Sequence, residues 1–491
     1  MPRILFVVNN PDRWPLSLPE VEVVAARTYL TDPRYSTLRN CKVYNLLRSY
    51  AYQSLGYYVS LLAEARGHKP MPRISTIQDI KSQSLTRAIS ADLDELIQKT
   101  LKHVQPDEFT LSIYFSRNVA KRYDLLARRL FNLFPLPLIR AEFKRGEEGW
   151  QLQGINAIST SDIPDAHREH VVALAQDYFT KARAHPTRKS PPRHALAILA
   201  DPGDPTKPSN AKALERFADA AEKLSFAVEL IDRDDYGRVA EFDALFIRST
   251  TAVDNYTYRF ARRAEAEGLI VIDDPESIVK CTNKVFLAEL LTRHRIPVPR
   301  TEILHRDNIA EVPRRLGFPL ILKQPDSSFS LGVVKVDDEP AYLAKVEQLL
   351  EESDLLIAQE YMRTDFDWRI GIIDQKPLYA CQYFMARGHW QIYNNEETGD
   401  DHTGDFKTIP IEMAPQRVVQ TALRAANLIG SGLYGVDLKE VNGRCSIIEI
   451  NDNPSIDAGV EDKMLRSYLY DRVMEVFARR LEAQREGRTI S

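Results

Sequence analysis

The segment from Ser446 to Gly459, SIIEINDNPSIDAG, places several polar side chains at the end of an apolar run. Glu449, Asn451 and Asp452 lie close together after two consecutive isoleucines, and Asn453 follows directly. A carboxylate that ends a buried strand is costly unless it is paired or bound to a cation. These residue types therefore predict a binding site rather than a strand that only packs.

The stretch before this segment predicts a β-hairpin that supplies a second carboxylate. Its turn contains Asn442-Gly443, a pair typical of tight hairpins. Pairing across the turn would bring Asp437 close to Glu449 and Asn451. Two carboxylates and one amide oxygen form an oxygen-only set of the kind that Mg²⁺ prefers. An exposed acidic hairpin is the alternative, but the apolar residues around these positions favour the site.

Two lysines stand where they could contact a polyphosphate. Lys284 lies in a helix predicted within VKCTNKVFLAELLTRHR, and Lys323 ends the apolar strand LILK. The loop DSSFSLG follows shortly after, with several hydroxyl groups and one glycine, Gly332. Backbone N–H groups of such a loop and lysine ammonium groups can bind phosphate together. A lone lysine is usually solvated, so the signal lies in the combination.

The order of these motifs resembles the ATP-grasp superfamily, and within it the RimK-like carboxylate–amine ligases of the α-L-glutamate ligase type. TNK at 282–284, LILK at 320–323, a loop over the phosphates, QEY at 359–361 and the D…EIN hairpin follow one another. Each motif is weak alone, and their order makes the resemblance specific. It implies an α/β chain of several domains, with an α+β ATP-grasp catalytic fold.

The resemblance also implies a role for individual residues. Those assigned to ATP are Lys284, Lys323, Ser328, Gly332, Glu360, Tyr361, Met362, Asp365 and Asp367. The lysines and the loop would contact the phosphates, residues 360–362 the adenine, and one of the two aspartates the ribose. The implied ligands of one or two Mg²⁺ or Mn²⁺ ions are Asp437, Glu449 and Asn451. The implied catalytic residues are Arg369 and Arg387, near the γ-phosphate or the substrate carboxylate, and Asn453, facing the reacting group.

Two positions depart from the family pattern. The phosphate loop has a single glycine, and Ser455 stands where a glycine is common. The acidic run that follows has two interpretations, recognition of an ammonium group or a solvated loop. Its members are Asp452, Asp457, Glu461 and Asp462.

The implied activity is ATP- and Mg²⁺-dependent amide formation between a carboxylate, activated as an acyl phosphate, and an amine. Glutamate, another amino acid or a peptide is the expected substrate. Arg248, Arg369 and Arg387 are expected around one cleft, and arginine suits carboxylate recognition. The alternatives are an ATP-grasp phosphotransferase and a catalytically silent ATP-binding scaffold.

The pattern of strands and helices indicates the parts that must position these residues. Strand–helix alternation over 194–277, with helices at 209–224 and 255–267, predicts a small parallel sheet. The family resemblance implies that this part is a pre-ATP-grasp domain. It follows a linker at 181–193 that is rich in proline and basic residues. We expect an N-terminal RimK-like-associated domain at 1–180, the ATP-grasp catalytic domain at 278–482 and a tail at 483–491.

Within the N-terminal domain the pattern predicts strands at 4–8 and 109–115 and helices at 44–66 and 85–104. The stretch 116–146 is rich in Lys and Arg. It predicts a solvated helix face or, as the alternative, a surface for an acidic partner. No aromatic RNA-binding motif accompanies it, so nucleic acid is disfavoured.

Composition sets limits on the class of protein. The 491 residues are 44% hydrophobic and 27% charged, as in ordinary globular proteins. No apolar run reaches the roughly 18 residues of a membrane span, and the four cysteines have no zinc or disulfide spacing. We therefore expect a cytoplasmic protein without a membrane segment, assembled as a homo-oligomer. The net charge of −4 conceals a basic first part, with 22 Lys and Arg against 15 Asp and Glu in residues 1–150.

Overall fold

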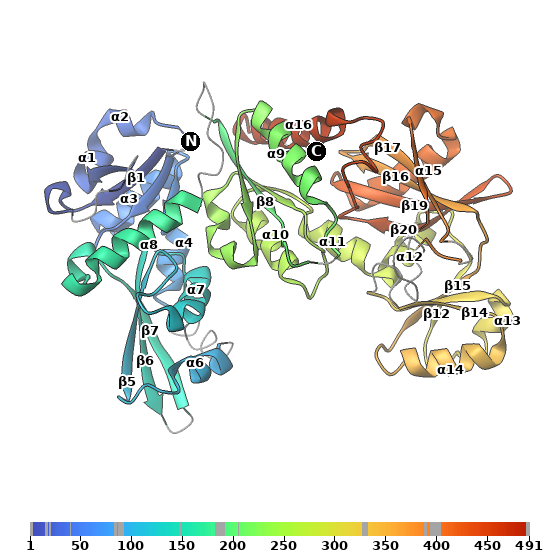
Figure 1. Cartoon of the computed structure of the whole chain (residues 1–491), viewed down its shortest axis with the longest axis horizontal. Coiled ribbons are helices and arrows are strands. Elements are labelled where there is room, and N and C mark those ends of the chain that lie inside the picture. Colours follow the sequence, from blue (N-terminus) through green and yellow to red (C-terminus); the bar gives the residue numbers. More distant parts are fainter. Residues whose placement is uncertain are drawn as a thin grey trace. The chain divides into compact units, whose positions relative to one another are not determined.

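The computed structural model describes residues 3–14, 18, 21–39, 41–82, 86, 93–146, 149–181, 192–204, 206–326, 332–386, 390–392 and 404–487. The chain forms two compact units, which can be followed by colour along the sequence in Figure 1. Unit 1 consists of residues 1–197 and 225–243, and unit 2 of residues 198–224 and 244–491. Both units combine helices with sheets, which confirms the predicted fold class.

Unit 1 begins with a parallel four-stranded sheet in the order β2-β1-β3-β4. Its strands are β1 (Arg3–Val8), β2 (Val21–Ala25), β3 (Cys41–Asn45) and β4 (Lys69–Met71). The accompanying helices are η1 (Pro11–Arg13), α1 (Ala26–Thr31), α2 (Pro33–Ser36), α3 (Leu55–Ala65) and α4 (Ile74–Asp79). The helix predicted over 44–66 is therefore wrong in its first part, because a fully buried strand pairs there with β1. The helix starts only after Ser54, whose side chain caps it.

The second sheet of unit 1 is antiparallel, with the order β5-β6-β7. Its strands are β5 (Glu108–Tyr114), β6 (Leu138–Gly146) and β7 (Gly149–Ala157), and its helices are α6 (Asp94–Leu101), η2 (Lys121–Tyr123), α7 (Asp124–Leu133), η3 (Thr160–Asp162), η4 (Asp165–His167) and α8 (Arg168–Lys181). One apolar core holds side chains from both sheets, including Phe6, Tyr44 and Ile113. The strand predicted at 109–115 is confirmed to within one residue. The helix predicted at 85–104 is the shorter α6, and most of the predicted linker lies outside the described residues.

Four further strands form a sheet in the order β11-β10-β8-β9, with β10 and β11 parallel. They are β8 (His194–Leu199), β9 (Phe226–Ile231), β10 (Ala244–Ile247) and β11 (Ile270–Ile272). The helices between and after them are α9 (Ala211–Lys223), η5 (Arg233–Glu241), α10 (Tyr256–Ala266) and α11 (Pro275–Thr282). This alternation confirms the small sheet expected here. The helix predicted from residue 209 starts two residues later, because the side chain of Asn210 is its cap.

Unit 2 continues with an antiparallel sheet in the order β12-β15-β13-β14. Its strands are β12 (Thr301–Leu304), β13 (Leu320–Lys323), β14 (Val333–Val336) and β15 (Leu356–Glu360), and its helices are α12 (Lys284–Arg293), α13 (Val312–Leu316) and α14 (Glu339–Leu349). Helices α13 and α14 cover one face of the sheet through a shared apolar core (Figure 1). The helix expected around Lys284 is interrupted at Asn283, which is extended and caps α12.

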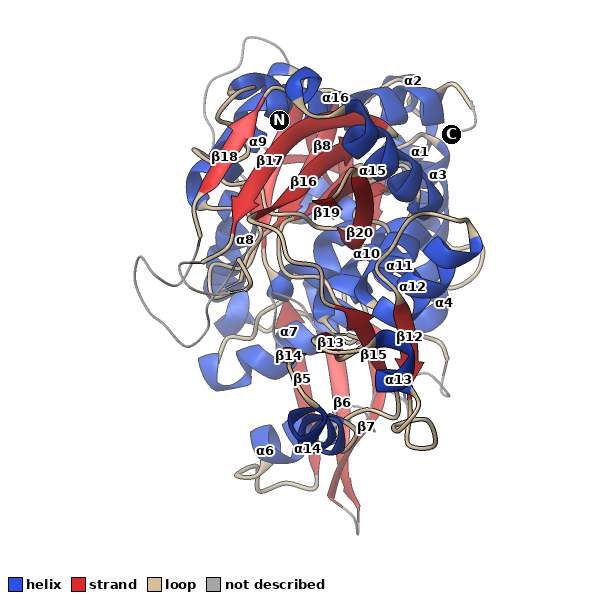
Figure 2. Ribbon diagram, turned by 90° about the vertical axis from the view of Figure 1, so that its right-hand side faces the viewer, coloured by secondary structure: helices blue, strands red, loops and turns tan. Residues whose placement is uncertain are grey.

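The last sheet is antiparallel with five strands, β18-β17-β16-β19-β20, which Figure 2 shows side by side. They are β16 (Phe366–Ile373), β17 (Lys376–Phe384), β18 (Phe406–Ile409), β19 (Leu433–Val441) and β20 (Arg444–Asn451); the helices are η7 (Ile411–Met413), α15 (Gln416–Ile429) and α16 (Ser467–Arg485). The predicted turn at Asn442-Gly443 is confirmed, and both residues have the positive φ that such a turn requires. An apolar core lies between this sheet and α15, which leaves the other face of the sheet for polar residues.

Three further expectations, on membrane spans, cysteines and the basic stretch, can be compared with the structure. Among the described residues, every helix is too short or too polar to cross a membrane. The four cysteines are buried and form no disulfide. In the basic stretch 116–146, Arg117, Arg128, Lys144 and Arg145 form ion pairs within unit 1. These pairs favour the solvated-face interpretation, and an acidic partner stays a prediction.

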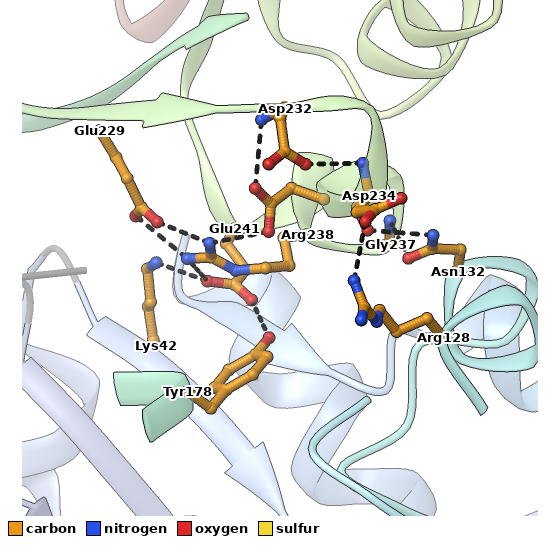
Figure 3. A network of polar contacts seen from close by, with 11 residues as sticks. Lys42, Arg128, Asn132, Tyr178, Glu229, Asp232, Asp234, Gly237, Arg238 and Glu241 are labelled. Carbon is orange, nitrogen blue, oxygen red and sulfur yellow. Dashed lines mark hydrogen bonds and ion pairs between the residues drawn. The ribbon is translucent and has the colours of Figure 1, made fainter. Parts of the chain in front are cut away.

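A buried network of charged residues ties the segment that contains β9 and η5 to the rest of unit 1 (Figure 3). Lys42 Nζ lies 2.6 Å from Glu241 Oε2, and both side chains are less than a tenth exposed. The Tyr178 hydroxyl donates to the same carboxylate, at 2.5 Å. Arg238 pairs with Glu229 at 2.5 and 3.0 Å. Burial alone would raise the pKa of Glu241, but Lys42 and Arg238 lower it to about 2.

Close backbone packing accompanies this network. Gly237 N–H donates to Asn132 Oδ1 at 3.0 Å, and a Cβ at Gly237 would lie only 2.9 Å from that oxygen. Arg128 and Asp234 form a more exposed ion pair beside it, at 2.7 Å. Residues 225–243 thus fold with unit 1, although the chain on either side of them belongs to unit 2.

Replacing Glu241 by Gln should destabilise the protein by about 3–5 kcal/mol, because Lys42 and Arg238 would stay buried without their shared anion. Asp234→Asn is the matched control, since its ion pair with Arg128 is half-exposed and is expected to contribute at most about 1 kcal/mol. Urea denaturation at neutral pH measures both changes.

The effect of Glu241→Gln should also depend on pH. Because the pKa of Glu241 is about 2 in the folded protein and 4.5 ordinarily, its charge stabilises the fold above pH 4.5. That stabilisation is lost as the pH falls toward 2. A gap between wild type and variant that stays constant over this range would contradict the role given to the carboxylate.

Candidate active site

A cleft in unit 2 is lined by the two antiparallel sheets and by the loops that follow β10 and β20. Its lining falls into three groups. An apolar group consists of Ile321, Val333, Tyr361, Met362 and Trp390. A second group, of charged side chains and one amide, consists of Lys284, Lys323, Asp367, Arg369, Asp437, Lys439, Glu449 and Asn451. A group rich in hydroxyls and amides consists of Thr206, Thr250, Thr251, Thr282, Asp452, Asn453 and Ser455.

An irregularity in strand register turns the predicted metal ligands toward this cleft. Asp437 pairs with Glu449, and the register of β19 and β20 shifts by one residue directly beside that pair. Ile447 and Ile450 are three positions apart, yet both pack in the core under α15, because the shift adds a residue between them. Glu449 and Asn451 therefore share the opposite face with Asp437. The predicted proximity of the two carboxylates is confirmed.

Arg369 lies directly across from Asp437 on the neighbouring strand. Its guanidinium binds both carboxylate oxygens, at 2.7 Å each, in the bidentate geometry that makes such pairs strong. Asn451 Nδ2 lies 3.3 Å from the same carboxylate. Burial raises the pKa of Asp437, and Arg369 opposes this rise.

The two predicted phosphate lysines meet at Glu449. Lys284 Nζ is 3.2 Å from Glu449 Oε1, at the start of α12, and Lys323 is 8% exposed at the end of β13. Burial opposes ionisation of Glu449, but Lys284 and Lys323 outweigh it and lower the pKa of this carboxyl. Burial lowers the pKa of Lys323 to about 8. The two ammonium groups lie near one carboxylate, and a polyphosphate would add further negative charge beside them.

Lys439 is a cleft residue that the motifs did not include. Its ammonium group lies 2.6 Å from Asp367 Oδ1 and 2.8 Å from Thr364 Oγ1. It follows Asp437 by two positions on one strand, and such positions share a face, so strand alternation could have revealed it. Trp390 lies in a loop, where no comparable periodic signal exists.

Most, but not all, of the residues expected around adenine and ribose line the cleft. The carboxylate of Glu360 accepts bonds from Arg300 N and Nε at 2.9 and 2.7 Å, so its charge is already paired. Tyr361 and Met362 line the cleft beside it. Asp367 also lines the cleft, whereas Asp365 is exposed and is not part of the lining.

Two predicted residues, Ser328 and Arg387, lie outside the described residues. Gly332, at the end of the phosphate loop, has a φ of +70°. This left-handed backbone conformation favours glycine, and a Cβ would lie 2.4 Å from Gln324 Oε1, so the Gln324 side chain would have to move.

Arg248 was expected beside the cleft but is instead fully buried and is not part of its lining. Its donors reach neutral groups, among them Ser209 Oγ at 3.0 Å and the carbonyl of Pro454 at 2.8 Å. Burial lowers its pKa to about 10. Asn453 accepts from Arg248 at 2.6 Å and donates to the Ser249 carbonyl at 2.7 Å, so both ends of its amide hold the loop after β20.

The donor set fits a hard divalent cation. Asp437 and Glu449 offer carboxylate oxygens and Asn451 an amide oxygen, the ligand types of Mg²⁺ and Mn²⁺. The cationic partners Arg369 and Lys284 already show that this face carries negative charge to be neutralised. No cluster of three or more His, Cys, Asp and Glu ligands occurs among the described residues. A site with two carboxylates relies on phosphate and water oxygens to complete its shell.

Two family models match the sequence. Residues 281–464 match the RimK-like ATP-grasp domain, and residues 26–174 match the RimK-like ATP-grasp N-terminal domain. The match over residues 281–464 identifies the class of the domain that contains the cleft, namely an ATP-grasp domain. Residues 281–464 thus belong to the RimK-like ATP-grasp domain family, and residues 26–174 to the RimK-like ATP-grasp N-terminal domain family.

Among curated proteins, the chain is similar to a probable alpha-L-glutamate ligase of Stutzerimonas stutzeri, with 26% identity over 225 residues, 45% of this chain and 71% of the relative. It is also 26% identical over 261 residues to the alpha-aminoadipate–LysW ligase LysX of Saccharolobus solfataricus, covering 49% of this chain and 88% of the relative. A solved structure of D-alanine–D-alanine ligase from Bacillus anthracis aligns with 59% of this chain and 99% of its own, at a TM-score of 0.47 and 17% identity.

Lys323→Ala should weaken binding of a non-hydrolysable ATP analogue by about ten- to a hundredfold, the effect of losing a charged hydrogen bond. Lys335→Ala is the control on the neighbouring strand, where the ammonium pairs with Asp337 at 2.5 Å, and it should change affinity much less. Calorimetric titration distinguishes the two. Equal affinities would show that the phosphate site is misplaced.

Proposed function

We propose that this protein is an ATP- and Mg²⁺-dependent ligase that joins a carboxylate to an amine and releases ADP and phosphate. The observation that carries the proposal is one cleft of a RimK-like ATP-grasp domain in which Lys284, Lys323 and Arg369 meet Asp437 and Glu449. Cations for phosphates and oxygen ligands for a metal are thus side by side.

Three groups of residues would bind ATP. The apolar group around Tyr361 and Trp390 is suited to the adenine ring, and the backbone of residues 361–362 to its polar edge. Asp367 is the ribose candidate that lines the cleft. Lys284 and Lys323 bind the phosphates by charge.

The reaction needs charge neutralisation and positioning rather than a side-chain nucleophile. The substrate carboxylate attacks the γ-phosphorus, and ADP leaves as the acyl phosphate forms. Lys284, Lys323 and Arg369 would neutralise the charge spread over the transferring phosphoryl group. Mg²⁺ held by Asp437, Glu449 and Asn451 would, when bound, neutralise further phosphate oxygens. The amine then attacks the acyl carbon, phosphate leaves, and an amide results.

An acidic amino acid, with glutamate as first candidate, is the proposed carboxylate substrate. The names of the two curated relatives refer to glutamate and to aminoadipate. The cleft also offers several cations, among them Arg369 and Lys439. An apolar substrate would leave such partly buried cations without an added anion.

A screen of amino-acid pairs for ADP release, with mass analysis of the products, tests the proposal. An amide product that depends on ATP and Mg²⁺ is expected. A phosphorylated product without an amide would identify a phosphotransferase, and ATP binding without turnover a scaffold.

Glu449→Ala and Asn451→Ala should each abolish ADP release, because the oxygen ligands on the hairpin would be incomplete. Both variants should retain the circular dichroism spectrum of the wild type. Glu351→Ala, at an exposed position, is the control and should turn over normally. Mg²⁺-dependent ADP release at the wild-type rate in the two hairpin variants would refute the metal assignment.

Glutamate or aspartate should support ADP release about tenfold or more faster than leucine, because an acidic side chain adds an anion to the cationic part of the cleft and leucine does not. Steady-state kinetics with each amino acid measures the ratio. Equal turnover with leucine would remove the acidic-substrate proposal and leave the ligase chemistry standing.

A further inference from the structure

We propose that Asp452 binds the ammonium group of the acceptor amine, an inference that rests on the proposed ligase function. The acidic run after β20 had two interpretations from the sequence, and the structure separates its members. Asp452 lines the cleft, whereas Asp457, Glu461 and Asp462 do not.

The other three acidic residues are engaged within their own loop and its supports. Asp457 Oδ1 accepts from Asn210 N at 2.7 Å, and Glu461 Oε2 accepts from Asp457 N at 2.7 Å. Asp462 accepts from Gly459 N at 2.7 Å and from the Tyr470 hydroxyl at 2.8 Å. These carboxylates shape the loop, and none of them is directed at a ligand in the cleft.

Asp452 differs in having no cationic partner among the described residues. Each of the other buried or half-buried carboxylates that line the cleft is paired in the described structure, and the pairs are Glu449–Lys284, Asp437–Arg369, Asp367–Lys439 and Glu360–Arg300. Asp452 is only 5% exposed and forms no ion pair with the residues that the structure describes. A buried carboxylate without a partner is costly, so a cationic ligand would stabilise it.

The hydrogen bonds of Asp452 are also incomplete. The Thr251 side chain interacts with its carboxylate and favours the ionised form, but Oδ2 has no hydrogen-bond partner within the described ranges. Thr282 Oγ1, which lines the same cleft, is buried and equally without one there. An ammonium group carries three donors and no acceptor, and these two oxygens are acceptors that it could satisfy. Asp273 is buried without partners as well, but it is not part of the cleft lining.

The direction of Asp452 separates it from the metal ligands. Asn451, the preceding residue, turns its amide to Asp437, whereas Asp452 contacts Thr251 in the loop after β10. These two consecutive side chains therefore face different elements of the fold. An amine held at Asp452 would therefore lie next to the phosphate region without competing for the metal.

The bound amine would complete the reaction as follows. One ammonium proton first passes to solvent, which frees the lone pair of the nitrogen. The nitrogen then attacks the acyl carbon, the N–C bond forms, and the C–O bond to phosphate breaks with the electron pair leaving on phosphate. Of the three ammonium protons one stays on the amide nitrogen, one passes to the departing phosphate and one to solvent. Asp452 positions the nitrogen before attack.

Two simple nucleophiles test the site without knowledge of the natural amine. Ammonium is a cation at neutral pH, whereas hydroxylamine is uncharged, and both convert an acyl phosphate into a stable product. Wild type, Asp452→Asn and the exposed control Asp354→Asn are each assayed with ATP, Mg²⁺, L-glutamate and either ammonium chloride or hydroxylamine. Asp452→Ser serves as a second variant if the Asn variant does not fold.

We expect the apparent KM for ammonium to rise about ten- to a hundredfold in Asp452→Asn, the effect of losing a charged hydrogen bond. Hydroxamate formation with hydroxylamine should stay within about twofold of wild type, because that nucleophile brings no charge to pair. Asp354→Asn should behave as wild type with both nucleophiles. The KM for Mg²⁺ and the affinity for a non-hydrolysable ATP analogue should be unchanged in Asp452→Asn.

The outcomes separate this site from the function on which it rests. If wild type forms no hydroxamate from glutamate, the ligase proposal for this substrate fails, and the ammonium site falls with it. If wild type forms hydroxamate but shows no ammonium-dependent amide, or if both nucleophiles are affected equally in Asp452→Asn, the ammonium site is wrong. A raised KM for Mg²⁺ would assign Asp452 to the metal instead.

Discussion

Neutralisation of the carboxylates on the β19–β20 hairpin is the constraint on which the cleft depends. Asp437 and Glu449 face each other across the hairpin and are partly buried, so each is stabilised by a cation. Arg369 arrives from the next strand and Lys284 from the start of α12, a helix that begins at that residue because Asn283 caps it. The sheet register and the helix start are therefore parts of one electrostatic arrangement. A metal ion and a polyphosphate would enter a site whose charges are already ordered.

Much of this arrangement could be predicted from the sequence, because local signals determine it. The Asn442-Gly443 turn fixes the hairpin, and the hairpin fixes the pairing of Asp437 with Glu449. The shift of register beside them could not be predicted, since it depends on how Ile447 and Ile450 pack under α15. The same holds for Arg248, whose burial arises from loops distant in sequence.

The errors in secondary structure have a related cause. The segment around Tyr44 has apolar residues at helical spacing, yet its first part is the buried strand β3. A short apolar run fits a helix and a buried strand equally well by period, and tertiary pairing with β1 decides between them. Lys439 shows the opposite case, in which a regular strand alternation was present but no motif drew attention to it.

Residues 225–243 fold with unit 1 although unit 2 flanks them in the sequence, and this arrangement limits which recombinants of the gene can fold. The chain passes from unit 2 into unit 1 after Leu224 and returns at Ala244. Arg238 and Glu241 on this excursion are matched by Lys42 and Tyr178, which lie far upstream in the same unit. Recombination that exchanged only the N-terminal residues would separate buried charges from their counterions. The two ends of the gene are thus expected to evolve together, whatever substrate the ligase domain acquires.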